Sequence, residues 1–329
     1  MTTNTTRALI VGATGISGQA LCRAALDAGW TTYGLSRSGN TPVDCVVPVA
    51  ADLLDPKSLE DALKDVRPEV VFFTAWMKKD SEQENIEVNS ATLRNVLDVL
   101  GPLDSVKHVA LMTGLKHYLG PFDAYGEAVM AETPFHETED RLDTPNFYYA
   151  QEDELFAGAD KYGFGWSVHR AHTVSGFAVG NAMNMMLTLS VYASICKELG
   201  EKFVFPGSET QWNGLTDLTD ADLLAEQMVW AATDDNARNE AFNIANGDVF
   251  RWRWLWPQFA EHFGVEPEGF DTEPRPLEPR MSDAAAAWKR IAEKHDLVES
   301  DVSRLASWWH TDGDLGRDME CLTDMNKSK

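Results

Sequence analysis

Residues 7 to 28 join an apolar strand pattern, a turn with spaced glycines and a helical pattern. Arg7 leads into an apolar run, the loop reads Gly12-Ala13-Thr14-Gly15-Ile16-Ser17-Gly18, and the helical pattern continues to Ala28. In such a unit the backbone N–H groups at the helix start converge where a pyrophosphate can bind. The order of strand, loop and helix therefore predicts a dinucleotide site, with a tight structural turn as the alternative. The residues expected to contact the cofactor here are Gly12, Thr14, Gly15, Ile16 and Gly18.

Short apolar runs alternate with helical patterns as far as residue 170. The runs predicted as strands are 7–12, 31–36, 46–50, 69–74, 106–112 and 165–169. The helical patterns between them are 15–28, 56–64, 85–100 and 148–161, the second starting with the N-cap pair Asp55-Pro56. This alternation is typical of parallel strands joined by crossover helices. It predicts an α/β fold, a doubly wound parallel sheet of the Rossmann type.

Beyond residue 170 the pattern changes to longer helices. They are predicted at 183–199, 220–233, 252–263, 283–294 and 301–309, with short strands near 203–205 and 241–244. We therefore expect a nucleotide-binding domain at 1–172 and a smaller, mostly helical substrate-binding lobe at 173–329, whose short strands can return to the main sheet. The segment 267–279 contains four prolines, so we predict an ordered surface loop there.

Composition excludes several classes of partner. The 329 residues carry a net charge of -24, which repels nucleic acid and anionic lipid surfaces, although solubility alone also accounts for such acidity. The four cysteines are far apart and form no metal-ligand cluster with histidine, so we expect them to be reduced and structural and expect no metal. The apolar run after Arg7 is too short for a signal peptide or a membrane span. We expect a cytoplasmic protein.

The end of the second predicted strand indicates which dinucleotide binds. An NAD-selective enzyme usually presents a carboxylate there to the ribose hydroxyl, but this chain has Ser36-Arg37-Ser38. A guanidinium between two hydroxyls can hold a 2'-phosphate, which favours NADPH/NADP+, and a solvated surface arginine is the alternative. Asp52-Leu53 follows the third strand, where a carboxylate can meet the adenine amine. The alternative for Asp52 is to cap the next helix.

A lysine and a tyrosine are candidates for the chemistry. Lys116 comes just after the strand 106–112, at the sheet edge where ligands of open α/β folds bind, although most loop lysines are simply exposed. Tyr148 begins a helix, and its phenol needs a neighbouring cation to share its proton at neutral pH. The usual short-chain dehydrogenase lysine, four residues after the tyrosine, is here Glu152. The residues alone do not rank Tyr148 above Tyr149, and either can be a core aromatic.

Several longer segments together resemble one family, the progesterone 5β-reductase and iridoid synthase family of atypical extended short-chain dehydrogenases. The resemblance runs from about residue 7 to the end of the chain. The matching stretches are GATGISG (12–18), YGLSRS (33–38), FFTAW (72–76), TGLKHYLGPF (113–122), NFYYAQEDELF (146–156), WSVHR (166–170), VYASICKE (191–198) and NEAFNIANGDVFRWRWLW (239–256).

The resemblance implies NADPH-dependent 1,4-reduction of an enone or enal, a small apolar α,β-unsaturated carbonyl substrate. It makes Lys116 and Tyr148 the catalytic pair: Tyr148 holds the substrate oxygen, and Lys116 lowers the phenol pKa and binds the cofactor ribose. Further residues implied at the cofactor are Thr74, Ala75, Thr113, Ala171, Thr173 and Val174. Those implied in the substrate pocket are Trp76, Leu119, Phe122 and Tyr125, each of which can equally be a core residue. The sequence is compatible with a homodimer.

The chain departs from the family pattern in two places. Ala171-His172 follows Arg170 where the family usually has Arg-Pro, beside the nicotinamide, and family members usually continue beyond Lys329. Two other functions use the same residues. One is a 1,2-carbonyl reductase, because a small shift in substrate pose moves hydride delivery to the carbonyl carbon. The other is a regulator that binds NADP(H) without turnover, since a fold alone does not prove catalysis.

Overall fold

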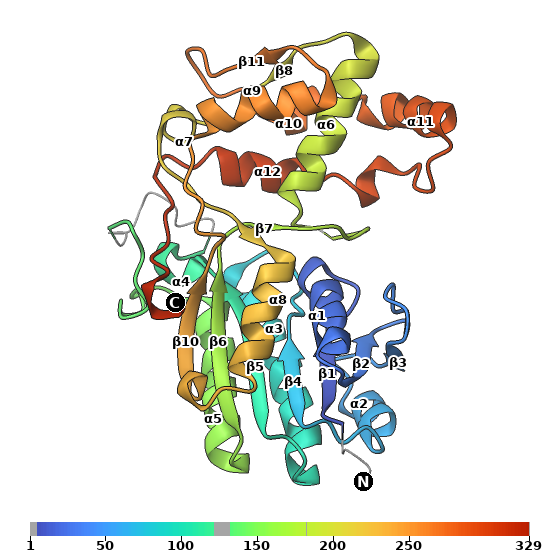
Figure 1. Cartoon of the computed structure of the whole chain (residues 1–329), viewed down its shortest axis with the longest axis vertical. Helices are drawn as coiled ribbons and strands as arrows, with labels where there is room; N and C mark the ends of the chain where they lie inside the picture. The colour runs from blue at the N-terminus through green and yellow to red at the C-terminus, as the bar shows by residue number, and fades with distance from the viewer. Residues whose placement is uncertain (1–4, 122–131, 182, 329) are drawn as a thin grey trace.

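A computed structural model describes residues 5–121, 132–181 and 183–328, and its main sheet has seven parallel strands, six from the first half of the chain and near its middle and one, β10, from further along (Figure 1). The strand order is β10-β6-β5-β4-β1-β2-β3. The bounds are β1 Arg7–Val11, β2 Thr31–Ser36, β3 Val47–Ala50, β4 Val70–Phe73, β5 His108–Gly114, β6 Gly165–Ala171 and β10 Glu240–Ile244. The predicted doubly wound α/β fold is confirmed, with strand positions within about two residues of those expected.

Helices cover both faces of this sheet because its strands are apolar on both sides. In β1, Leu9 and Val11 pack with the helices of one face, and Ala8 and Ile10 pack with those of the other. The first face carries α2 (Pro56–Leu63), α3 (Glu82–Leu100) and α5 (Phe147–Tyr162), and the second carries α1 (Ile16–Asp27) and α8 (Ala221–Ala231). The predicted cap of α2 is confirmed, since Asp55 accepts a hydrogen bond from the Lys57 N–H.

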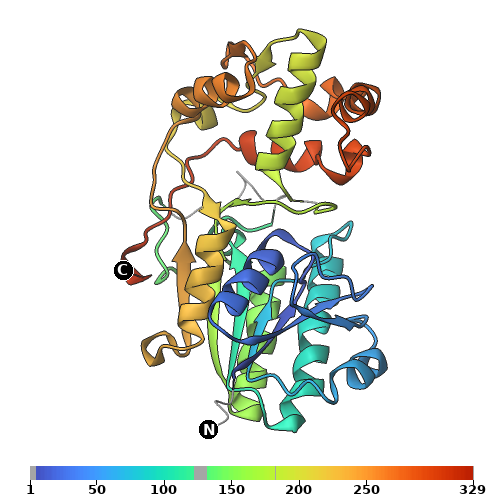
Figure 2. The same cartoon turned by 45° about the vertical axis from the view of Figure 1, so that its right-hand side comes forward.

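A second, mostly helical lobe lies over the carboxyl edge of the sheet in both Figures 1 and 2. Its main helices are α6 (Met185–Leu199), α9 (Trp252–Phe263), α11 (Ala284–His295) and α12 (Trp308–Leu315). They share a core in which Phe203 stacks on Trp256 with ring centroids 3.9 Å apart. Shorter elements of the chain are η1 (Gly101–Leu103), α4 (Lys116–Leu119), β7 (Val174–Ser175), β8 (Phe203–Val204), α7 (Glu209–Asn213), β9 (Thr219–Asp220), η3 (Asp235–Ala237), β11 (Pro267–Glu268), α10 (Leu277–Arg280), η4 (Val302–Arg304) and η5 (Asn326–Ser328).

Two predictions for the second half need correction. The helix expected at 301–309 is a short turn, η4, followed by a separate helix, α12, because the Ser307 N–H donates to the Thr188 hydroxyl instead of continuing a helix. The segment 267–279 is not loop throughout, since it contains the two-residue strand β11 and the start of α10. The short strand β10 lies in the main sheet beside β6, while β8 pairs with β11.

A helix that crosses a bilayer must be both long and apolar. Within residues 5–121, 132–181 and 183–328, no helix is both long and apolar enough to span a membrane.

Candidate active site

The glycine loop between β1 and α1 has the backbone geometry of a phosphate-binding turn. Gly12 has a φ of 93°, and a Cβ there would come within 2.9 Å of the Thr74 hydroxyl oxygen. A Cβ on Gly18 would collide with the Gly12 carbonyl, so both positions need glycine. Gly15 is the N-cap residue of α1 and brings no side chain over the first N–H groups of the helix. This arrangement leaves the helix N-terminus open to an anion.

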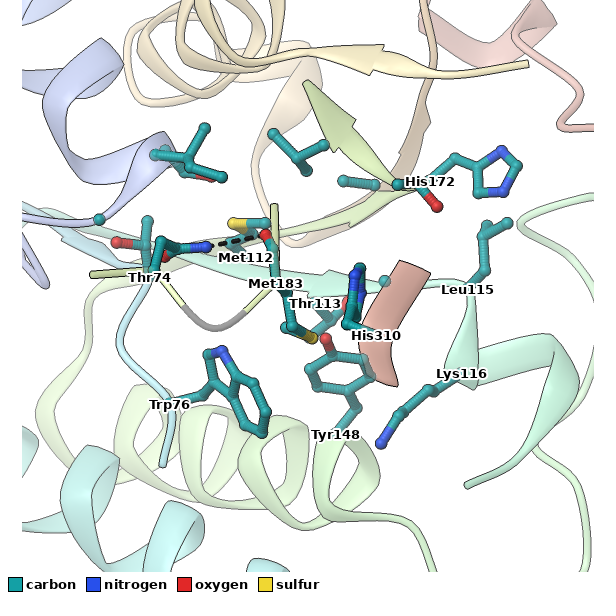
Figure 3. A pocket seen from close by; sticks show the side chains of 18 of the residues that line it. Thr74, Trp76, Met112, Thr113, Leu115, Lys116, Tyr148, His172, Met183 and His310 are labelled. Carbon is teal, nitrogen blue, oxygen red and sulfur yellow. Dashed lines mark hydrogen bonds between the residues drawn. The ribbon is translucent and has the colours of Figure 1, made fainter. Parts of the chain in front are cut away.

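One cavity lies at the carboxyl edge of the sheet, under the helical lobe (Figure 3). It brings together residues from the glycine loop, from the ends of β4, β5 and β6, and from α4, α5 and the region of α12. The residues expected at the site that line it are Gly15, Ile16, Gly18, Thr74, Ala75, Trp76, Thr113, Lys116, Tyr148, Ala171, Thr173 and Val174. Thr113 is buried, and among the described residues its hydroxyl has no hydrogen-bond partner.

The other residues expected at the cofactor lie beside this cavity. Arg37 and Ser38 are exposed in the turn that follows β2, and the Ser36 hydroxyl donates to the Asn40 carbonyl. The Gln19 side chain donates to the carbonyl of Thr14. An adenosine ribose extending from the glycine loop toward the end of β2 would meet the exposed Arg37 guanidinium.

Asp52 is exposed, and its carboxylate accepts a hydrogen bond from the Leu54 N–H at 2.9 Å. The alternative role considered for it, capping the next helix, is wrong because Asp55 caps α2. Leu53 is buried in the sheet core, and its carbonyl accepts from Asn95. Its expected contact with the cofactor stays a prediction.

The expected substrate-pocket residues differ in where they lie. Trp76 lines the cavity and stacks on Phe147 at 6.0 Å between ring centroids. Leu119 does not line this cavity; it is fully buried in an apolar cluster with Tyr118 and Phe135. Phe122 and Tyr125 fall outside the described residues.

Tyr148 and Lys116 come from adjacent elements and line the same cavity (Figure 3). Asn146 links them: its side-chain oxygen accepts from the Tyr148 N–H at 3.0 Å, and its side-chain nitrogen donates to the Lys116 carbonyl at 2.7 Å. A Cβ on Gly114 would lie 3.4 Å from the Tyr148 hydroxyl, so the bare end of β5 lets the phenol approach. The Lys116 ammonium lies 4.9 Å from the ring centroid of Phe147.

Burial controls the protonation of the Tyr148 phenol. Burial first, and then the negative charge of Glu82, raises the pKa of Tyr148 above its ordinary value. The phenol is therefore protonated at neutral pH and can donate a hydrogen bond to an oxygen in the cavity. The lowering of its pKa by Lys116, which the family resemblance implies, stays a prediction.

The structure distinguishes the roles of Tyr148 and Tyr149, which the sequence alone did not rank. The Tyr149 side chain is buried. Its hydroxyl donates a hydrogen bond to the His117 carbonyl at 2.5 Å, and the same hydroxyl oxygen accepts one from the Leu142 N–H at 3.0 Å. Both contacts tie the phenol to backbone. Tyr149 is therefore a structural residue behind the site.

Glu152 stands four residues after Tyr148, where short-chain dehydrogenases usually have a lysine, and its carboxylate belongs to a buried cluster of charged groups. It is buried, and its carboxylate lies 2.9 Å from Arg141, 3.7 Å from His117 and 3.9 Å from Arg170. Burial raises its pKa, but the nearby His117 imidazole and the two guanidiniums outweigh burial, so the pKa of Glu152 is lowered. This buried cluster anchors α4, which carries Lys116, to α5 and β6.

Sequence reasoning missed four titratable residues of the cavity wall: His172, His310, Asp314 and Arg317. His310 and Asp314 lie on α12, and Arg317 follows the end of α12 by two residues, so all three are far along the chain from the glycine loop. His172 was noted only as a departure from a family pattern. The positions of the others gave no signal, because no recognised spacing links them to the loop.

His172 is the centre of a second buried polar cluster. Its Nδ1 donates to the Asp217 carboxylate at 2.6 Å, and Asp217 also accepts from the Thr323 N–H at 2.8 Å. Burial lowers the pKa of His172, but the contact with Asp217 outweighs burial and raises it to about 9. The cluster therefore ties the end of β6 to the C-terminal segment through a charged pair.

The parallel sheet, the glycine loop and the cavity at the carboxyl edge define a Rossmann-fold protein with a helical lobe over its ligand site. Solved structures agree on the fold. The Thermus thermophilus UDP-glucose 4-epimerase complex with NAD is 19% identical, with a TM-score of 0.62 over 93% of this chain and 98% of the other. The epimerase Mth375 of Methanothermobacter thermautotrophicus is 18% identical, with a TM-score of 0.66 over 93% and 92%.

Sequence comparison identifies the family. Residues 57–308 match the family model of the PRISE-like Rossmann-fold domain. The (S)-8-oxocitronellyl enol synthase of Camptotheca acuminata is 40% identical over 338 residues, covering 98% of this chain and 86% of the relative. The 3-oxo-Δ(4,5)-steroid 5-β-reductase of Arabidopsis thaliana is 40% identical over 337 residues, with the same coverage. The chain belongs to the PRISE-like Rossmann-fold family.

Proposed function

We propose that this protein is an NADPH-dependent reductase of activated C=C bonds, acting on small apolar enones or enals. The observation that carries the proposal is the shared cavity of Tyr148 and Lys116 beside the glycine loop. Relatives at 40% identity support the reaction class, since they are named as a steroid 5-β-reductase and an oxocitronellyl enol synthase.

The residues present fit a pyridine dinucleotide. The open N-terminus of α1 suits the pyrophosphate. The buried Thr113 hydroxyl, which has no hydrogen-bond partner in the described part of the chain, offers a further polar contact in the cavity. Arg37, exposed after β2, would hold the 2'-phosphate that distinguishes NADPH from NADH. Several structural neighbours are described in complex with NAD, which supports the nucleotide class but not the choice of NADPH.

The chain's own groups would act on the substrate oxygen. The chemistry that NADPH would supply when bound is a hydride for the β-carbon of the substrate, and the carbonyl oxygen would then carry negative charge. The protonated Tyr148 phenol would donate a hydrogen bond to that oxygen, where a donor aimed at developing charge contributes most to the rate. Lys116 would add a positive charge on the same side of the cavity. The α-carbon is then protonated from Tyr148 or from water.

The test is to supply purified protein and NADPH with 2-cyclohexenone, an open-chain enal and a saturated ketone. Cofactor oxidation is followed by absorbance, and the products are identified by mass spectrometry and NMR. We expect oxidation with the first two compounds and saturated carbonyl products. Allylic alcohols, or reduction of the saturated ketone, would instead assign the protein to 1,2-carbonyl reduction. NADPH binding without turnover of any compound would contradict an enzymatic role.

A further inference from the structure

His310 enters the cavity from the helical lobe. The residue is only 5% exposed, and Figure 3 shows its imidazole projecting from α12 toward the hydroxyl end of Tyr148. It lines the cavity and also the adjoining groove, which is lined in addition by Trp76, Lys116 and Trp309. Of the glycine loop, Gly15, Ile16, Ser17 and Gly18 line the cavity and not the groove. His310 therefore lies on the side where a substrate enters, away from the pyrophosphate site.

One nitrogen of His310 faces a carboxylate. Its Nε2 is 3.7 Å from the Asp314 carboxylate, which in turn accepts a hydrogen bond from the Thr173 hydroxyl at 2.9 Å. A carboxylate on this side favours the tautomer with its proton on Nε2. Burial lowers the pKa of His310, and Arg317, Lys116 and Lys78 act in the same direction against Asp314. The imidazole is therefore neutral near pH 7.

The other nitrogen, Nδ1, is left as a buried acceptor of a residue that lines the cavity. Among the described residues, the Nδ1 of His310 is buried and has no hydrogen-bond partner. A buried acceptor without a partner is costly, and ligand-binding positions are a common reason for finding one. With Nε2 directed at Asp314, the acceptor on the opposite side of the ring suits a group that donates a hydrogen bond.

We propose that the Nδ1 of His310 accepts a hydrogen bond from a hydroxyl group of the substrate. The substrates are then α,β-unsaturated carbonyl compounds that carry a hydroxyl group away from the reacting alkene. Tyr148 binds one end of such a molecule through the carbonyl oxygen, and His310 binds the hydroxyl. This inference rests on the proposed function and narrows its substrate class.

The test compares (E)-2-alkenals of increasing chain length with their ω-hydroxy counterparts. The readout is the ratio of kcat/KM for each hydroxylated compound to that for its plain partner. For at least one chain length we expect the ratio to reach roughly ten, which is the value of about one hydrogen bond. His310→Phe should bring that ratio close to one. His310→Asn should keep most of it, because the amide can place a polar atom near the position of Nδ1.

His295→Phe serves as the matched control, since His295 is exposed in the same lobe, and it should leave the ratio unchanged. A ratio near one in the parent protein at every chain length would overturn the inference, as would a high ratio that survives in His310→Phe. The saturated ω-hydroxy aldehydes and their plain partners are also titrated against the NADP+ complex. This binding comparison reads the hydroxyl contact without turnover, so it separates failure of the His310 assignment from failure of the proposed reductase activity.

Discussion

At the scale of single residues, the site depends on a phenol that stays protonated. Burial raises the pKa of Tyr148, and the neighbouring Tyr149 is tied to backbone groups, so of these two tyrosines Tyr148 is the one available to a ligand in the cavity. The sequence pointed to Tyr148 only through the family resemblance, because two adjacent tyrosines at a helix start have the same local pattern. What distinguishes them is the direction of each side chain, which depends on the packing of α4 against α5.

Replacing Tyr148 by Phe tests this role. The variant should lose turnover by roughly a hundredfold or more, because it removes a donor to the developing negative charge. NADPH affinity, measured by fluorescence titration, should stay within about threefold of the parent if the phenol acts mainly on the substrate. Tyr162→Phe is the control on the same helix, where the hydroxyl donates a hydrogen bond to the exposed carboxylate of Asp98. Turnover in Tyr148→Phe equal to that of the control would show that the phenol is misassigned.

Arg37 is the residue on which we propose that the choice between NADPH and NADH depends. NADPH should bind more tightly than NADH by roughly ten- to a hundredfold, because a guanidinium forms charge-assisted hydrogen bonds with the 2'-phosphate. Arg37→Ala should remove most of this difference. Arg23→Ala is the control: it changes an exposed arginine of α1 that pairs with Asp222, and it should leave the difference in affinity in place. Equal affinities of the parent protein for the two nucleotides would refute the assignment.

At the scale of elements, the strands and most helices could be predicted because their signals are local. Apolar runs mark the strands, and the cap pair Asp55-Pro56 marks the start of α2. The break before α12 could not be predicted, because it depends on a hydrogen bond from Ser307 to Thr188, which is distant in the sequence. The cavity residue His310 lies on that helix, so its place in the site was also hidden.

The junction after β6 should make stability depend on pH. The pKa of His172 is about 9 in the folded protein, against an ordinary value of 6.5, so the folded state holds this proton more tightly than the unfolded chain. Its contribution is complete below about pH 6.5 and is lost as pH rises through 9. The free energy of unfolding, measured by urea titration, should therefore fall between these values.

Asp217→Asn removes the charge that raises this pKa and should flatten the fall, although the variant will be less stable at pH 6.5. His262→Asn, at a residue exposed on α9, is the control and should keep the slope of the parent. The same slope in the parent and in Asp217→Asn would exclude the pair as its source.

At the scale of the whole molecule, two lobes share the work of the site. The sheet lobe contributes the glycine loop, Tyr148 and Lys116, while the helical lobe contributes His310, labelled in Figure 3, and Asp314 to the cavity wall. The first set could be proposed from motifs and a family resemblance, since its residues follow strands of a known fold. The second set could not, because it depends on how the helical lobe is seated over the sheet.

The most direct test of the account follows the transferred hydrogen. The protein is given an enone and NADPH that carries deuterium at both C4 positions, and the product is analysed by NMR. The account predicts a saturated carbonyl compound with one deuterium on the former β-carbon. Deuterium on the former carbonyl carbon of an allylic alcohol would contradict it.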